Sequence, residues 1–296
     1  MLDGVMLLWF ILTGCSLAFV AWDSFFNTPT SRVQQVAWLL VVFYTGPVGL
    51  FFYFLACRNP GVGMHDAFTD VSWKQSLNSE MHCLAGDATG ILVAAIVVSS
   101  WDIPNGIDLG IEYATGFVSG LFIFQALMMI GMYGGNYIKA VRKTFFAETV
   151  SMNMVMVGMF GTMIILKDAI PEARHPEHAA FWFVMGMGTI VGGLTAYPIN
   201  AWLVRNGLKH GCMTVQGRDE QPKATAPAAH EHAGHASHQH HDMHGGEEHS
   251  HPADHEGMQM KSIAAGPALL WMLGTFALMV LALWLVSIYI TPIRFS

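Results

Sequence analysis

The chain has 296 residues, of which 53% are hydrophobic and only 12% are charged, with a net charge of −7. Soluble domains carry about 25% charged residues, so a soluble protein of this composition would lack the polar side chains that cover a surface. The composition therefore excludes an ordinary cytosolic enzyme and a disordered chain, and it indicates a multi-pass membrane protein. No long basic run suggests a nucleic-acid partner. The four cysteines contain no CxxC pair, which argues against a disulfide scaffold.

Seven apolar stretches are long enough to cross a bilayer, which needs about 20 residues per helix. The sequence therefore predicts an all-α polytopic membrane helix bundle with about seven transmembrane helices. The first stretch lacks a basic region and a clear cleavage site, so we expect it to be retained as a helix. The predicted spans cover approximately residues 4–22, 33–57, 81–99, 112–134, 148–166, 181–204 and 264–290.

The spans divide the chain into four parts. Residues 1–72 are expected to form two helices and a loop, and residues 73–213 a four-helix membrane core. Residues 214–262 form a His-rich loop whose middle almost lacks aliphatic side chains and is expected to be disordered. A C-terminal helix follows in 263–296.

The 14 Lys and Arg residues predict the orientation of the bundle. With seven alternating spans, ten of them lie on the side of the N-terminus. Because cytoplasmic loops are enriched in Lys and Arg, this side is expected to face the cytoplasm. The N-terminus and the His-rich loop would then be cytoplasmic, and the C-terminus would lie outside the membrane.

The His-rich loop contains ten of the 15 histidines of the chain. Neutral imidazole is a good ligand for Cu, Zn, Ni and Co ions, and a flexible segment lets several imidazoles converge. We expect this tract to capture or sense transition-metal ions; a low-complexity linker or a pH-responsive tether is the alternative. The ten residues are His230, His232, His235, His238, His240, His241, His244, His249, His251 and His255.

Three chemically active side chains stand at the start of the third predicted span: His82, Cys83 and Asp87. Ionisable groups are costly in lipid and are therefore functional candidates. Cys83 and Asp87 are four residues apart and share a helix face, with His82 on an adjacent face. Together they predict a metal-ion site. The alternative is that His82 and Asp87 bind polar neighbours such as Asn153 or Asn200 and join helices.

The fifth predicted span carries a stripe of methionines at helical spacing. Soft thioether and thiolate ligands prefer Cu(I), so this stripe and Met81, beside the three active side chains, predict an ion path that favours copper. Adaptable packing of methionine in an apolar core is the alternative. The stripe consists of Met152, Met156, Met159 and Met163.

Two carboxylates and two prolines complete the set of unusual residues within the spans. Glu112 and Glu148 open the fourth and fifth predicted spans, where carboxylates favour helix N-termini. Glu148 is also one turn from Met152, which makes it a candidate proton or ion ligand. Pro47 and Pro198 predict helix kinks, because proline removes a backbone hydrogen bond.

Two sequence motifs resemble an uncharacterised bacterial membrane family that is described as a domain of unknown function. They are MHCLAGDATG at 81–90 and YPINAWLVRNGLKHG at 197–211, and the similarity spans roughly 73–213. Because some members of the family carry a copper-related label, the resemblance implies a link to copper. The spacing from His82 to Asp87 is also that of nickel and cobalt permeases, but these continue with His where this chain has Ala88.

Taken together, the sequence predicts a transporter or handling protein for a transition-metal ion, with copper favoured and Zn, Ni or Co as alternatives. The chain is not expected to be an enzyme or to hold a tight cofactor, and its expected partners are the bilayer, the metal ion and a metal-handling protein. A non-catalytic scaffold or sensor is the principal alternative. A haem enzyme is a further one, although only one histidine lies within a predicted span.

Overall fold

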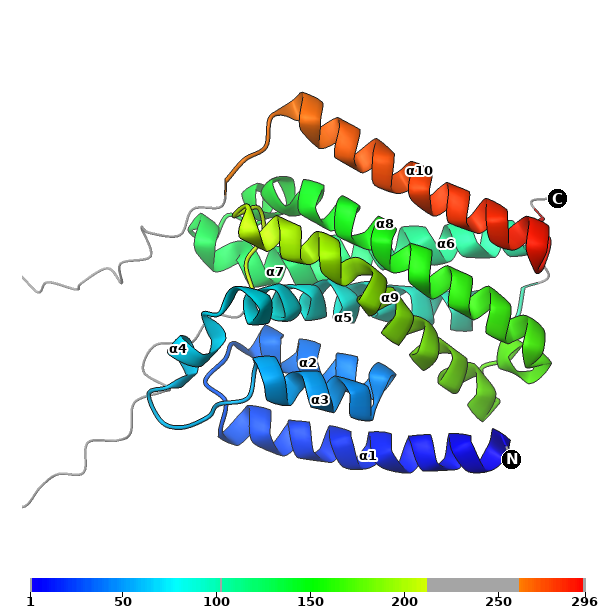
Figure 1. Ribbon diagram of the computed structural model, residues 1–296, viewed down its shortest axis with the longest axis horizontal. Helices are drawn as coiled ribbons and strands as arrows, with labels where there is room; N and C mark the ends of the chain where they lie inside the picture. Colours follow the sequence, from blue (N-terminus) through cyan, green and yellow to red (C-terminus); the bar gives the residue numbers. More distant parts are fainter. Residues whose placement is uncertain (1, 102, 212–260, 295–296) are drawn as a thin grey trace, which may run out of the picture.

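A computed structural model describes residues 2–101, 103–211 and 261–294, and within these ranges every regular element is helical (Figure 1). Most of the helices run along one common direction, with α5 near the middle of the bundle and α10 on its outside. The elements are α1 (Leu2–Phe26), α2 (Arg32–Thr45), α3 (Pro47–Ala56), α4 (His65–Thr69), α5 (Ser72–Val98), α6 (Asn105–Val118), the π-helical η1 (Ser119–Gln125), α7 (Ala126–Met129), the 3₁₀ turn η2 (Ile130–Tyr133), α8 (Tyr137–Ala169), the 3₁₀ turn η3 (Pro171–Arg174), α9 (Ala179–Arg205) and α10 (Ala265–Tyr289).

Six helical segments in the described ranges are long and apolar enough to cross a membrane: α1, α5, the continuous run from α6 to η2, α8, α9 and α10. This confirms the predicted all-α membrane bundle. The count differs from the predicted seven at one place, the second apolar stretch.

The second apolar stretch forms a helical hairpin, α2 and α3, instead of one span. Gly46, between the two helices, adopts φ +56° and ψ −131°. Pro47 is the first residue of α3, and because proline has no backbone N–H it cannot continue the hydrogen bonds of α2. The chain therefore reverses where the sequence predicted only a kink. Each arm is short, since 14 residues of α2 extend for about 21 Å and a bilayer core needs about 30 Å.

Both open ends of the hairpin lie at the end of the bundle where α1 finishes. Arg58, just after α3, forms an ion pair with Asp23 near the end of α1, with 3.5 Å between Nε and Oδ1. Asn59 donates to the carbonyl of Asn27 over 3.0 Å. The hairpin thus enters the bundle and returns to the side from which it came, and the chain termini lie at the opposite end of the bundle (Figure 1).

Asn78 of α5 fixes both arms of the hairpin. Its Nδ2 donates to the carbonyl of Ala56 in α3 over 2.8 Å. Its Oδ1 accepts from Gln34 Nε2 and Trp38 Nε1 of α2, each over 3.3 Å. A second link lies near the hairpin tip, where the hydroxyls of Tyr44 and Thr89 are 2.7 Å apart. These bonds satisfy polar groups that lipid would leave unpaired.

Glycines let α5 approach the α6–η1 helix closely. A Cβ added to Gly86 would lie 2.7 Å from the Cα of Gly120, and one added to Gly90 would lie 2.7 Å from the Cα of Gly116. Small residues at such crossings are typical of helix packing in membranes. The close approach brings the η1 backbone next to the face of α5 that carries Cys83.

Two further observations concern the starts of three helices and the position of Pro198. The α5, α6 and α8 helices start at Ser72, Asn105 and Tyr137, well before the apolar runs that the sequence marks as spans. Glu112 and Glu148 therefore lie inside helices and do not cap them. Pro198 lies within α9, which continues to Arg205.

Candidate functional site

Five buried polar residues meet in the interior of the bundle and are called the polar cluster here: Cys83, Asp87, Glu148, Asn200 and Lys209. Each is at most 1% exposed. Helix α5 supplies the thiol and one carboxyl group, α8 the second carboxyl group, α9 the amide, and the segment after α9 the ammonium group. Residues far apart in the sequence therefore form one connected site.

Lys209 reaches this site because the chain turns back after α9. Gly207 has φ +69°, and the N–H of Leu208 bonds to the carbonyl of Leu203 over 2.9 Å. The Nζ of Lys209 then donates to Cys83 Sγ over 2.8 Å and to Asn200 Oδ1 over 2.6 Å. Lysine is almost never fully buried unless it is paired, so these contacts account for its position.

Acidic groups surround Lys209. Burial lowers the pKa of Lys209, but the neighbouring Cys83, Glu148 and Asp87 raise it by more, so that the pKa lies above its ordinary value. The direction of this shift favours the ammonium form of Lys209.

Cys83 connects the ammonium group to the carboxyl groups. Its thiol donates to Glu148 Oε2 over 2.7 Å while its sulfur accepts from Lys209. The amide oxygen of Gln125 in η1 lies 3.6 Å from the same sulfur. The donors and acceptors therefore form a continuous chain from Lys209 through Cys83 to Glu148.

The Asp87 and Glu148 carboxyl groups lie together against Gly120. A Cβ on Gly120 would overlap both Asp87 Oδ1 and Glu148 Oε1. Neither oxygen of Asp87, nor Glu148 Oε1, accepts a hydrogen bond from any donor in the described chain. Two adjacent carboxylates repel each other unless they share a proton or hold a cation.

A charge count of the polar cluster also indicates that the two carboxyl groups need a shared proton or a further cation. With a neutral thiol, two carboxylates face one ammonium group, which leaves the site short of one positive charge. An unbalanced buried charge costs several kcal/mol in a low-dielectric interior. The site therefore has place for one proton or one additional cation.

The two amides that the sequence offered as partners of His82 and Asp87 bond to other groups. Asn200 exchanges hydrogen bonds with Ser151 over 2.9 and 3.1 Å, and Asn153 accepts from Tyr113 over 2.8 Å and donates to Thr275 of α10 over 3.0 Å. Neither amide hydrogen-bonds to His82 or Asp87, since the donors and acceptors of the amides bond to these other groups.

Of the residues predicted to form one site, the structure brings Cys83 and Asp87 together but leaves His82 apart. Five residues separate His82 from Asp87, which is about 140° around a helix of 3.6 residues per turn. The ring of His82 is 1% exposed, and neither nitrogen has a hydrogen-bond partner in the described chain. Met81 lies on another side of α5, where it lines an apolar groove.

The four methionines of the predicted path, Met152, Met156, Met159 and Met163, are all at most 1% exposed. Glycines on neighbouring helices receive three of them. A Cβ on Gly188 would lie 2.9 Å from Met163 Cγ, and one on Gly192 would lie 3.2 Å from Met159 Cβ. Met152 reaches Gly116 of α6 in the same way, 2.8 Å from the added Cβ. This stripe fills space between α8, α9 and α6, and only Met152 lies one turn from Glu148.

The described residues contain no group of three or more His, Cys, Asp or Glu side chains placed to hold a metal ion. The ammonium group of Lys209 lies 2.8 Å from Cys83 Sγ. The histidine tract from His230 to His255 lies outside the described residues.

Sequence reasoning missed Lys209 and gave Glu148 too small a role. Lys209 counted only as one of the basic residues beside the membrane, because no apolar run includes it. The Asn206–Gly207 pair was the available signal, since glycine permits the positive φ that returns the chain to the bundle.

Residues 72–209 match the model of a family described as a domain of unknown function (DUF4396). The match confirms the resemblance on which the sequence motifs depend. It begins at the first residue of α5 and ends at Lys209, so it includes the whole polar cluster. No curated protein and no solved structure shows significant similarity to the chain.

Proposed function

We propose that the protein transports a transition-metal ion across a bacterial inner membrane and that the polar cluster is the site where the ion exchanges with protons. One observation carries the proposal: a thiol and two carboxyl groups are buried together in the spanning helices with a single ammonium group. Ionisable groups at such positions are costly and mark ion or proton pathways in membrane proteins. The chain is assigned a transport role, without a catalytic step or a tightly bound cofactor.

The ligand chemistry favours copper. Cys83 supplies one soft sulfur ligand, and Met152 lies one helical turn from Glu148. Soft ligands prefer Cu(I), whereas Zn, Ni and Co ions also accept carboxylates. We therefore infer Cu(I) as the preferred cargo, with those divalent ions as weaker competitors.

Charge balance in the polar cluster determines how many protons leave it when a metal ion binds. Metal ligands bind in their deprotonated form. If Asp87 and Glu148 share one proton and Cys83 keeps another, the cluster is neutral with Lys209 charged. A monovalent ion then replaces one of these protons, and a divalent ion replaces both. Lys209 remains as a constant positive charge that prevents a second metal ion from entering.

The hairpin supports the orientation that we infer for the bundle. Because α2 and α3 return to the same side, Arg32 joins the basic side of the molecule, and only Lys167, Arg174 and Arg294 remain opposite. The enrichment of Lys and Arg in cytoplasmic loops then supports a cytoplasmic His-rich loop. Both chain termini lie outside, in contrast to the cytoplasmic N-terminus that seven spans predict.

Metal content and tolerance of cells test this function. Cells that express the wild type should differ from empty cells in content of, or tolerance to, at least one of Cu, Zn, Ni and Co, and Cys83→Ala should lose that difference. Cys15→Ala is the matched control, because this thiol lies exposed on α1, far along the chain from the cluster. If wild-type, Cys83→Ala and empty cells are indistinguishable for all four metals, the proposal fails.

A further inference from the structure

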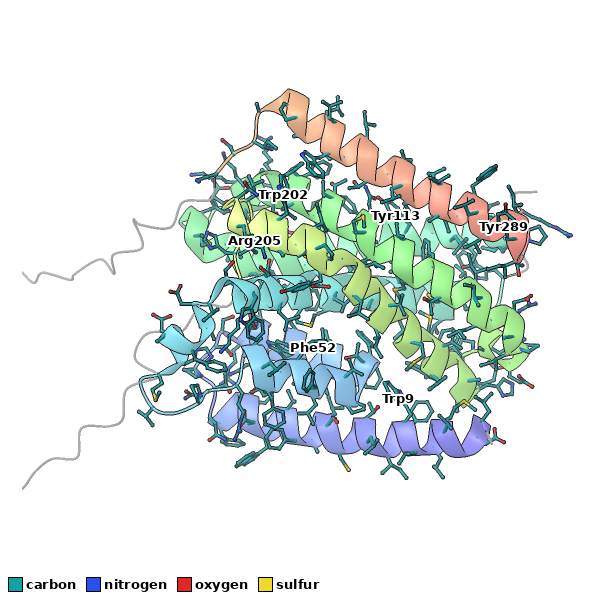
Figure 2. The ribbon with its side chains drawn as sticks, in the orientation of Figure 1. Trp9, Phe52, Tyr113, Trp202, Arg205 and Tyr289 are labelled. Carbon is teal, nitrogen blue, oxygen red and sulfur yellow. The ribbon has the colours of Figure 1, made fainter. Side chains whose placement is uncertain are left out.

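A groove beside the polar cluster combines an apolar wall with one buried carboxyl group. Its volume is about 190 Å³, and it lies between the α2–α3 hairpin, α5 and α9. Figure 2 shows Phe52 on the side of α3 that faces α5. Glu80 of α5 is the one ionisable acidic side chain among the residues that line this groove.

Glu80 has no partner that explains its burial. It is 1% exposed, and neither carboxyl oxygen accepts a hydrogen bond within the described chain. Its Oε1 lies 3.4 Å from where a Cβ on Gly193 would stand, so the carboxyl group packs against a residue without a side chain, and both residues line the groove. The positive charge of Lys209 interacts electrostatically with Glu80, but the hydrogen bonds of Lys209 go to Cys83 and Asn200.

Aromatic rings surround the same space. Phe52, Trp73 and Tyr197 line the groove together with aliphatic side chains of α2, α5 and α9. Aromatic faces attract ammonium groups, most strongly where water is excluded. A carboxylate, aromatic rings and an apolar wall are complementary to one kind of molecule, a cation with an apolar body.

We propose that this groove is a binding site for an amphiphilic organic amine, whose ammonium group binds Glu80 and whose apolar body lies along α5 and α9. The size fits such a ligand, since a cavity of about 150 Å³ accepts a benzene ring. A phosphatidylethanolamine headgroup is a poorer match, because its phosphate would stand close to the Glu80 carboxylate. The site is separate from the metal-ion site and does not depend on metal transport.

Binding of 4-phenylbutylamine to the full-length protein in phosphatidylcholine nanodiscs tests the proposal by isothermal titration calorimetry. The neutral analogue 4-phenylbutanol controls for partition into lipid. The amine should bind the wild type at least tenfold more tightly than it binds Glu80→Gln, while the alcohol should not distinguish the two proteins. Equal affinity of the amine for both proteins would overturn the proposal.

Two further variants separate loss of the site from loss of the fold. Gly193→Val keeps the charge but fills the groove, and should also weaken amine binding. Glu112→Gln removes a carboxyl group that is likewise buried and unpartnered but lies outside the groove, and should leave binding unchanged. Equal loss in Glu112→Gln, or undiminished binding in Gly193→Val, would contradict the assignment. Competition by phosphatidylethanolamine added to the nanodiscs would assign the groove to a lipid instead.

Discussion

Single residues carry the central chemistry, and Lys209 is the clearest example. A lysine outside every predicted span enters the bundle and binds the thiol of Cys83, which in turn donates to Glu148. Cys83 and Asp87 were predictable from their spacing of four residues, because a helix aligns such positions. Lys209 was not predictable in this way, since its position depends on a turn after α9 and on Cys83, which lies 126 residues earlier in the chain.

Replacing Lys209 by methionine should strongly destabilise the protein. Methionine keeps the length of the side chain but leaves Asp87 and Glu148 without their cation, and breaking a buried ion pair typically costs about 3–5 kcal/mol. Thermal unfolding in detergent measures the effect. Lys261→Met, which removes an exposed lysine, should be close to neutral.

A second substitution distinguishes charge from packing. The double variant Glu148→Gln/Lys209→Met should recover a large part of the stability lost in Lys209→Met, because it removes one of the uncompensated carboxyl groups. If the two losses simply add, the coupling between these residues is absent and the charge count given above is wrong.

Gly120→Ala should disrupt the carboxyl pair without changing any charge. The new Cβ would overlap Asp87 Oδ1 and Glu148 Oε1, and overpacking of this kind costs about 1–3 kcal/mol. Gly110→Ala in α6 is the matched control, because nothing lies within 4 Å of its added Cβ. A Gly120→Ala protein as stable and as active as Gly110→Ala would show that the two carboxyl groups are not held at this place.

At the scale of elements, hydropathy located the spans but not their ends or the hairpin. A hydropathy pattern detects the apolar turns of a helix and misses its polar turns. The sequence therefore predicts that Glu148 lies at a helix start, although α8 begins at Tyr137. The Gly46–Pro47 pair is compatible with either a kink or a reversal. Contacts across the bundle, such as those of Asn78 with both arms, decide between them.

Gly46→Ala should weaken the hairpin. Its φ of +56° is unfavourable for a residue with a side chain, and a Cβ would also overlap Thr13 Oγ1. Such strain costs about 1–3 kcal/mol. Gly14→Ala, in the middle of α1 with nothing within 4 Å of the added Cβ, should not destabilise the protein. Unfolding midpoints of the two variants provide the comparison, and equal midpoints would contradict the reversal at Gly46.

At the scale of the whole molecule, the hairpin changes the inferred side of the N-terminus and leaves that of the C-terminus unchanged. The six spanning segments put the start of α1 and the end of α10 at the same end of the bundle, as Figure 1 shows. The helical membrane class followed from composition alone. Composition does not determine the side of the membrane on which the N-terminus lies, because adding or removing one span moves every earlier segment to the opposite side.

Protease protection in spheroplasts tests the inferred orientation. An epitope tag placed before Leu2 should be digested by external protease, whereas the same tag inserted between Gly245 and Gly246 should be protected until the membrane is opened. A protected N-terminal tag would return the topology to seven spans.

Flux into proteoliposomes loaded with a metal indicator and a pH indicator tests whether the polar cluster exchanges a metal ion for protons. We expect wild-type entry of Cu(I), with one proton moved outward per ion. The flux should fall at least tenfold in Cys83→Ala and Glu148→Gln and should not fall in Cys15→Ala. Wild-type flux equal to that of empty liposomes for Cu, Zn, Ni and Co, or undiminished flux in Cys83→Ala, would contradict this exchange.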